Sequence, residues 1–215
     1  MKKILITTVP FGDKSQLPLK MLKDAGVEYL INPLNKKLTE SELAEMVSNY
    51  DVIIAGTEQI TANVMNRAVN LKMISRVGIG LDSVDLLAAE KKGIVVSYTP
   101  DAPTLAVAEL TLGLMLSLLR SVHVSNSQMH KGIWHRFFGK RLEDVTVGII
   151  GVGRIGTGVL NRLKGFGTKN ILVNDVEPNR KLDCEFKIEW TSKENIYKYS
   201  DIISLHILLT YLTKN

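Results

Sequence analysis

A glycine-rich turn is the part of this sequence whose residue types and spacing are best suited to binding a charged ligand. An apolar stretch enters Gly-Val-Gly-Arg-Ile-Gly, and a helical pattern leaves it. In a mononucleotide-binding βαβ unit, the first glycine makes the tight turn, the second lets the backbone approach a pyrophosphate, and the third lets helix and strand pack closely. Gly151, Gly153 and Gly156 have this spacing. They predict a phosphate site at the start of a helix.

A carboxylate after the next predicted strand narrows the ligand. Asp175 ends the segment ILVND and follows Gly153 by about 20 residues, the distance expected for a ribose-binding acid. Its two oxygens can accept hydrogen bonds from the adenosine 2′- and 3′-hydroxyls, and they would repel a 2′-phosphate. The pattern therefore predicts NAD rather than NADP. The alternative is a tight turn without a ligand, because the glycine spacing alone is a weak signal.

The histidines do not form an obvious catalytic or metal-binding arrangement. His123, His130 and His135 lie on or just after a predicted long helix, and no cysteine or carboxylate stands at metal-ligand spacing from them. We interpret them as surface or interface histidines, and we predict no metal site. Glu109 is the only acid in the apolar helix, so we expect it to make a buried structural hydrogen bond rather than to act in catalysis.

The first part of the chain alternates between short apolar segments and helical patterns, as α/β folds do. Thr39 and Glu42 form a predicted capping box at the start of one helix. The predicted strands are 4–8, 27–31, 51–56, 73–80 and 94–98. This pattern predicts a flavodoxin-like, doubly wound parallel sheet over residues 1–99.

From residue 100 the pattern changes. Two prolines and Asp101 form a loop that also starts a helix, with Asp101 as a candidate cap. The helix continues to about Arg120 and is apolar on nearly every side, which predicts burial, with the 103–121 region as the surface of a homodimer. A second series of four strands begins at Thr146. We expect residues 100–215 to form an incomplete Rossmann domain.

Composition excludes several classes of protein. Hydrophobic residues make up 45% of the chain and charged residues 23%, which is ordinary for a globular protein. The net charge of +5 comes from scattered lysines, so we expect no nucleic-acid partner. The longest apolar stretch contains Glu109 and is too short for a bilayer, and the N-terminus lacks a secretory pattern. With Cys184 as the only cysteine, we expect a cytoplasmic protein with neither a membrane span nor a disulfide.

Four segments in a fixed order make the sequence resemble a known family, the D-isomer-specific 2-hydroxyacid dehydrogenases, especially their phosphoglycerate-dehydrogenase-like branch. The resemblance implies an NAD-dependent enzyme in which the first domain binds substrate and the second binds NAD. The four segments are RVGIGLDSVD at 76–85, TPDAPTLAVAELTLGLML at 99–116, GIWHRFFGKRLEDVTVGIIGVGRIG at 132–156 and SDIISLHILLT at 200–210.

The resemblance also implies roles for individual residues. The backbone N–H groups of Gly78 and Ile79 are expected to bind the carboxylate of a 2-hydroxy or 2-oxo acid, with 3-phosphoglycerate as one candidate. A glycine-containing loop at the carboxyl end of a parallel strand can aim free amides at an anion, although a plain βα turn is the alternative. Leu208 replaces the proline that is usual in the family's nicotinamide-side loop. Further residues matching the family's cofactor contacts are Thr104, Arg154, Ile155, His206 and Thr210.

Hydride transfer from a 2-hydroxy acid needs a cation, a base and a carboxylate that orients the base. In the family these are an arginine, a glutamate and a histidine, and all three are expected beyond residue 215. A complete dinucleotide fold has six strands, so we expect a truncated chain that lacks at least about 60 residues and has an unpaired strand edge. Such a chain is predicted to bind NAD weakly and to be inactive alone. The alternative is a non-catalytic, dimeric NAD-binding module.

Overall fold

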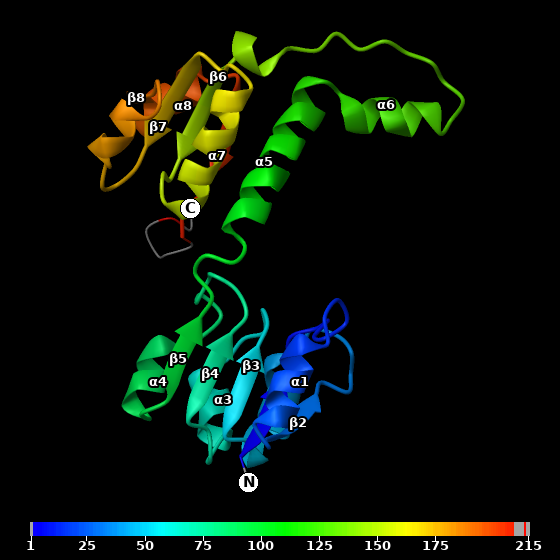
Figure 1. The fold of residues 1–215 in the computed structure, drawn as a ribbon, viewed down its shortest axis with the longest axis vertical. Coiled ribbons are helices and arrows are strands. Elements are labelled where there is room, and N and C mark those ends of the chain that lie inside the picture. Colours follow the sequence, from blue (N-terminus) through cyan, green and yellow to red (C-terminus); the bar gives the residue numbers. More distant parts are fainter. Residues whose placement is uncertain (1, 209–212, 214–215) are drawn as a thin grey trace. The chain divides into compact units, whose positions relative to one another are not determined.

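The computed structural model describes residues 2–208 and 213 of the chain. The chain divides into two compact units, Met1–Ala102 and Pro103–Asn215. Figure 1 draws each unit as a sheet with helices packed on it. The division falls at residue 102, close to the boundary that the sequence places at residue 99. Each unit is described by itself below.

The first unit contains a five-stranded parallel sheet in the order β2-β1-β3-β4-β5. This is the flavodoxin order, so the predicted fold of this part is confirmed. The strands are β1 (Lys3–Ile6), β2 (Glu28–Ile31), β3 (Val52–Ala55), β4 (Met73–Arg76) and β5 (Val95–Tyr98). The helices are α1 (Leu17–Asp24), α2 (Glu40–Met46), η1 (Val47–Asn49), α3 (Ala62–Arg67) and α4 (Leu86–Lys91).

Side-chain caps and a buried centre explain why these segments form their elements. The predicted capping box is present at α2: Thr39 Oγ1 accepts from the Glu42 N–H, and the Glu42 carboxylate accepts from the Thr39 N–H. The central strands supply the fully buried side chains Leu5, Ile53 and Ile74. Because parallel strands are covered by helices on both faces, they consist of nearly continuous apolar residues.

The second unit contains a four-stranded parallel sheet in the order β8-β7-β6-β9. This matches the first four positions of the dinucleotide-binding order 3-2-1-4-5-6. The strands are β6 (Thr146–Ile150), β7 (Asn170–Asn174), β8 (Glu189–Trp190) and β9 (Ile202–Leu205). The helical segments are α5 (Thr104–Leu119), α6 (Val122–Met129), η2 (Leu142–Asp144), α7 (Arg154–Gly165), η3 (Arg180–Cys184) and α8 (Lys193–Tyr199).

The long helix α5 differs from its prediction in its cap, and only part of its apolar surface is buried within this unit. Pro103, rather than Asp101, occupies the N-cap position. One face of α5 packs beside α7 (Figure 1), where a Cβ on Gly158 would lie 3.2 Å from the Ala108 Cβ. Within this unit only one face of α5 meets α7, so the predicted burial of its other apolar side chains would require the second subunit. The exposed apolar side chains are Leu105, Leu110, Leu114 and Leu118, with 64%, 62%, 56% and 61% of their surface accessible.

Glu109 is also more exposed than predicted. Its Oε1 accepts a hydrogen bond of 2.9 Å from the Arg162 guanidinium, so the expected structural role of the side chain agrees with its contact. However, 70% of the Glu109 side chain is accessible, whereas 22% of Arg162 is. The expected burial is therefore wrong, because Glu109 lies outside the buried face of α5.

Within the described part of the chain, no single helix has the length and hydropathy of a membrane span. Helices α5 and α6 meet those criteria only as a pair, and the pair is bent by 65°. The bend lies between the two helices, at Ser121, whose backbone is left-handed with φ of 53°.

Candidate functional site

The turn between β6 and α7 places its first glycine where no other residue fits. Gly151 has φ of +92°, a left-handed conformation that L side chains rarely adopt. A Cβ at this position would lie 2.4 Å from the backbone oxygen of His206. The Gly151 N–H donates to the Asn174 oxygen at 2.8 Å. The turn is thus held between the ends of β7 and β9.

The other two glycines have contrasting surroundings. A Cβ on Gly156 would lie 2.1 Å from the Gly151 oxygen, so this glycine allows the first turn of α7 to pack on the loop. A Cβ on Gly153, the N-cap of α7, would have no atom within 4 Å. The open space therefore lies at the helix N-terminus, where backbone N–H groups attract phosphate oxygens. This arrangement fits the division of roles among the three glycines of a dinucleotide-binding turn.

Asp175 lies directly after β7 and contacts the turn. Its Oδ2 accepts from the Val152 N–H at 2.7 Å, and its Oδ1 accepts from the Glu177 N–H at 3.2 Å. A carboxylate oxygen can accept more than one hydrogen bond, so both oxygens retain capacity for the hydroxyls of a ribose. The strand β7 therefore places this carboxylate beside the glycine turn.

A cavity of about 360 Å³ joins these groups within the second unit. It combines a polar turn and a carboxylate with an apolar wall, as sites for nucleotides require. Its lining residues are Ile150, Gly151, Gly153, Asn174, Asp175, Val176, Lys193, His206, Ile207, Leu208 and Thr213. The cavity stands at the carboxyl ends of the parallel strands, which is where ligands bind in open α/β sheets.

His206 reaches this cavity from the end of β9. Its Nε2 and the Ser204 Oγ are 2.9 Å apart, and its backbone N–H donates to the Ile150 oxygen at 2.8 Å. Burial lowers the pKa of the His206 imidazole because it disfavours the charged form. At neutral pH the ring is therefore an uncharged hydrogen-bonding group beside the glycine turn.

The remaining predicted cofactor residues have different positions. Arg154 and Ile155 form the first turn of α7, directly after Gly153. Thr104 begins α5, and its Oγ1 is buried without a hydrogen-bond partner in the described structure. Thr104 is not among the residues that line the cavity beside the glycine turn. Thr210 lies outside the described residues.

The predicted substrate loop follows β4 in the first unit. Gly78 has φ of +146°, and its N–H donates to Thr99 Oγ1 at 2.8 Å. Ile79 follows it, and within the described residues its N–H has no hydrogen-bond partner. Sequence reasoning missed Thr99, which occupies one of the two amides that were expected to meet substrate. Of the two predicted amides, that of Ile79 is therefore the one open to an anion in this structure.

Sequence reasoning also missed two buried ionisable residues close to this loop. Glu58 is 2% exposed and Arg76 is 9% exposed. Arg76 Nε is buried without a partner among the described residues, and a Cβ on Gly78 would lie 2.5 Å from Arg76 Nη1. The signal in the sequence was present, because each charged residue stands at or just after an otherwise apolar strand.

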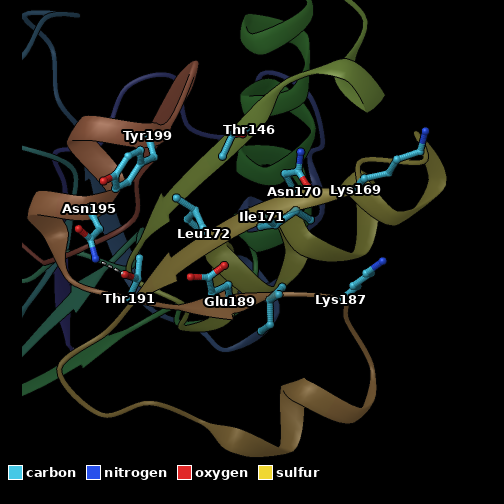
Figure 2. Close-up of a pocket in the computed structure, with 11 residues that line it drawn as sticks. Thr146, Lys169, Asn170, Ile171, Leu172, Lys187, Glu189, Thr191, Asn195 and Tyr199 are labelled. Atoms are coloured by element: carbon cyan, nitrogen blue, oxygen red, sulfur yellow. Dashed lines mark hydrogen bonds between the residues drawn. The ribbon is translucent and has the colours of Figure 1, made fainter.

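A larger cavity, of about 480 Å³, lies at the other end of the second sheet. Figure 2 shows Thr146 and Asn170, the first residues of β6 and β7, beside this cavity, together with Lys169 and Lys187. The glycine turn is at the opposite ends of these strands. Because open α/β sheets bind ligands at the carboxyl ends of their strands, the smaller cavity is the candidate cofactor site.

Among the described residues, no group of three or more His, Cys, Asp or Glu side chains is arranged to hold a metal ion. The polar groups of the site are backbone amides, the Asp175 carboxylate, the Asn174 amide, the Lys193 ammonium, the Thr213 hydroxyl and a half-buried imidazole. These groups suit a phosphate-bearing organic ligand rather than a metal ion.

The sequence model of the D-isomer specific 2-hydroxyacid dehydrogenase catalytic domain matches residues 4–213. The chain belongs to this family. Within the family, it is 37% identical over 221 residues to the D-3-phosphoglycerate dehydrogenase of Methanocaldococcus jannaschii, with 100% of this chain and 40% of the relative covered. It is 34% identical over 206 residues to the hydroxypyruvate reductase of Thermotoga maritima, with 94% of this chain and 64% of the relative covered.

A solved structure of the same dehydrogenase class is similar over nearly the whole chain. The D-lactate dehydrogenase of Aquifex aeolicus, complexed with NAD and lactic acid, has a TM-score of 0.82 and 25% sequence identity. The match covers 99% of this chain and 62% of that enzyme. The chain thus spans between 40% and 64% of the length of these three members of the 2-hydroxyacid dehydrogenase family.

Proposed function

We propose that this chain binds NAD in the second unit, with the pyrophosphate at the turn from Gly151 to Gly156 and the adenosine ribose at Asp175. The observation that carries this proposal is the open space above Gly153 beside a carboxylate that already contacts the turn. Thr104, which the family resemblance implies as a further contact, does not line this cavity in the described structure. The negative charge of Asp175 favours NAD over NADP, because a 2′-phosphate would be repelled.

The first unit is proposed to bind the carboxylate of a 2-hydroxy or 2-oxo acid. The open Ile79 N–H provides one donor, and the Gly78 N–H provides a second once Thr99 Oγ1 is displaced. The whole protein would transfer a hydride between C2 of this acid and NAD. Bound NAD accepts or supplies the hydride at its nicotinamide ring, whereas this chain's own residues bind and orient the two reactants.

The 215-residue chain is proposed to turn over little or no substrate. A histidine base of this reaction type needs a carboxylate that fixes its tautomer, and no described histidine has one. The ring of His206 meets Ser204, that of His123 meets Ser117, and that of His130 meets the Asn126 backbone oxygen. The ring of His135 meets Phe137.

The exposed apolar face of α5 supports a homodimer through the 103–121 region. Four leucines of this helix, the first at Leu105 and the last at Leu118, are more than half accessible. Exposed apolar patches of this kind mark association surfaces. A second candidate function follows, because an NAD-binding dimer without a histidine–carboxylate pair could serve as a non-catalytic module. We propose a cytoplasmic location for either function.

The test is a comparison of binding with turnover for the purified 215-residue protein. Calorimetry should detect saturable NAD binding, and absorbance at the NADH band should detect no turnover with D-lactate, D-glycerate or D-3-phosphoglycerate. Absence of NAD binding would overturn the proposed cofactor site. Saturable dehydrogenase activity would instead overturn the proposed lack of turnover.

A further inference from the structure

A small cavity of about 130 Å³ lies within the first unit. Glu58, which is 2% exposed, forms part of its wall. Burial of a carboxyl group is costly unless hydrogen bonds compensate for the lost water, so the contacts of Glu58 indicate what the cavity is built to hold. Other lining residues include Thr7, Thr8, Gly56 and Val77.

The two carboxyl oxygens of Glu58 have different surroundings. Oε1 accepts from the Gly56 N–H at 3.0 Å and from the Thr7 hydroxyl. Oε2 has no hydrogen-bond partner among the described residues, and it lies 2.9 Å from the point where a Cβ on Gly56 would stand. A side chain on Gly56 would collide with Oε2 and with Thr8, so this glycine allows the carboxyl group, with its unused acceptor, to lie here.

The cavity stands at the topological switch point of the first sheet. Thr7 follows β1 and Gly56 follows β3, and these are the neighbouring strands from which the chain departs in opposite directions across the sheet. Flavodoxin-like folds bind their ligands at this point. Val77, which also lines the cavity, leads directly into Gly78 and Ile79. The cavity therefore adjoins the segment proposed to hold the substrate carboxylate.

We propose that this cavity receives the substituent that the substrate carries beyond C2, and that Glu58 selects a hydrogen-bond donor there. The inference rests on the proposed function of the Gly78–Ile79 loop. A hydroxyl or ammonium group can donate to Oε2, whereas a methyl group leaves this acceptor unsatisfied and a carboxylate or phosphate presents a second acceptor to it. Glu58 is thus a specificity-determining residue.

Lys36 and Lys37 also line the cavity, and their positive charges would favour an anionic substituent instead. The Lys36 ammonium already donates to Glu42 Oε1 at 2.7 Å, so its charge is paired. Lys37 is exposed, and water and salt screen an exposed charge much more than a buried one. The buried carboxyl group therefore has the larger influence on what enters the cavity.

Titrations followed by backbone amide NMR signals test the inference on the 215-residue protein. D-lactate, D-glycerate and D-3-phosphoglycerate differ in carrying a methyl, a hydroxyl and a phosphate beyond C2. All three should shift the Ile79 signal, and D-glycerate should also shift Gly56 and bind about tenfold more tightly than the other two. If Ile79 responds but D-glycerate has no advantage, the Glu58 inference is wrong and the substrate loop stands. If the Ile79 signal responds to none of the three acids, the proposed substrate loop and the Glu58 inference are both wrong.

The variant Glu58→Gln separates recognition from structure. Its amide oxygen can still accept from the Gly56 N–H, and its NH₂ group would face the cavity as a donor. The preference for D-glycerate over D-3-phosphoglycerate should fall about tenfold or reverse. The matched control is Glu45→Gln, which removes the same charge from an exposed position on α2 and should leave the preference unchanged. An unchanged preference in Glu58→Gln contradicts the inference. If Glu58→Gln does not fold, the titrations of the wild-type protein with the three acids test the Glu58 inference on their own.

Discussion

The Asp175 carboxylate and the Val152 N–H are joined by a hydrogen bond of 2.7 Å, which ties the end of β7 to the turn after β6. This contact fixes the carboxylate beside the open N-terminus of α7. The proposed ribose acceptor and the proposed phosphate-binding turn are thereby positioned before any ligand arrives. Such preorganisation reduces the entropy that binding must otherwise overcome.

Alanine substitutions at the glycines should separate ligand binding from stability. Gly153→Ala should fold normally, because no atom lies within 4 Å of the new Cβ, yet its methyl group should occupy the phosphate space and weaken NAD binding at least about tenfold. Gly156→Ala should destabilise the chain by about 1–3 kcal/mol or more, because its Cβ would lie 2.1 Å from the Gly151 oxygen. Thermal unfolding and NAD calorimetry measure the two effects.

The matched control for these variants is Gly165→Ala at the end of α7. Its Cβ would also meet no atom within 4 Å, but it is far along the helix from the turn. We expect unchanged NAD affinity and a free energy of unfolding equal to or higher than wild type, since alanine is the better helix former. Equal NAD affinity of Gly153→Ala and wild type would contradict the phosphate site at the turn.

Leu114 on α5 should report on the proposed dimer. Its side chain is 56% accessible within the unit, and Leu114→Asp would place an unpaired charge in an apolar interface, which is costly. Sedimentation equilibrium should show dimers for wild type and at least about a hundredfold weaker association for the variant. Leu87→Asp, at a 70% accessible leucine of the first unit, should remain dimeric. Monomeric wild type at all concentrations would rule out this interface.

The capping box of α2 should make stability sensitive to acid. The Lys36 ammonium, followed by the Thr39 N–H and hydroxyl, lowers the pKa of Glu42 from 4.5 to about 2. Because the folded value is the lower one, this contribution is present above the unfolded pKa of 4.5 and is lost as the pH falls through about 2. Carboxyl NMR titration checks the pKa. Urea unfolding should show a smaller loss of stability from pH 7 to pH 3 in Glu42→Gln than in wild type.

Much of the fold could be predicted because local signals and the global arrangement agree. The Thr39–Glu42 pair marked a helix start that the structure contains. The strand-and-helix alternation predicted the parallel sheets that both units contain, because parallel strands joined by helices have few permitted connections. Asp175 lies beside the turn, as expected when the ends of adjacent parallel strands meet at one edge.

Other features depended on contacts that one local pattern does not contain. The apolar composition of α5 predicted burial but did not reveal that only the Ala108 side of the helix faces α7. Thr99, which follows β5, engages the Gly78 N–H, and Glu58 is held by Thr7 and Gly56, which follow β1 and β3. Each of these required the positions of residues distant in sequence.

The most direct test of the central claim is a calorimetric comparison of NAD with NADP on wild type and Asp175→Asn. The asparagine can still accept from the Val152 N–H, so thermal unfolding should change little, while the negative charge is lost. Wild type should bind NAD at least about tenfold more tightly than NADP, and the variant should lose most of that preference. Equal affinity of wild type for the two nucleotides, or no binding of either, would contradict the assignment of this turn and carboxylate as an NAD site.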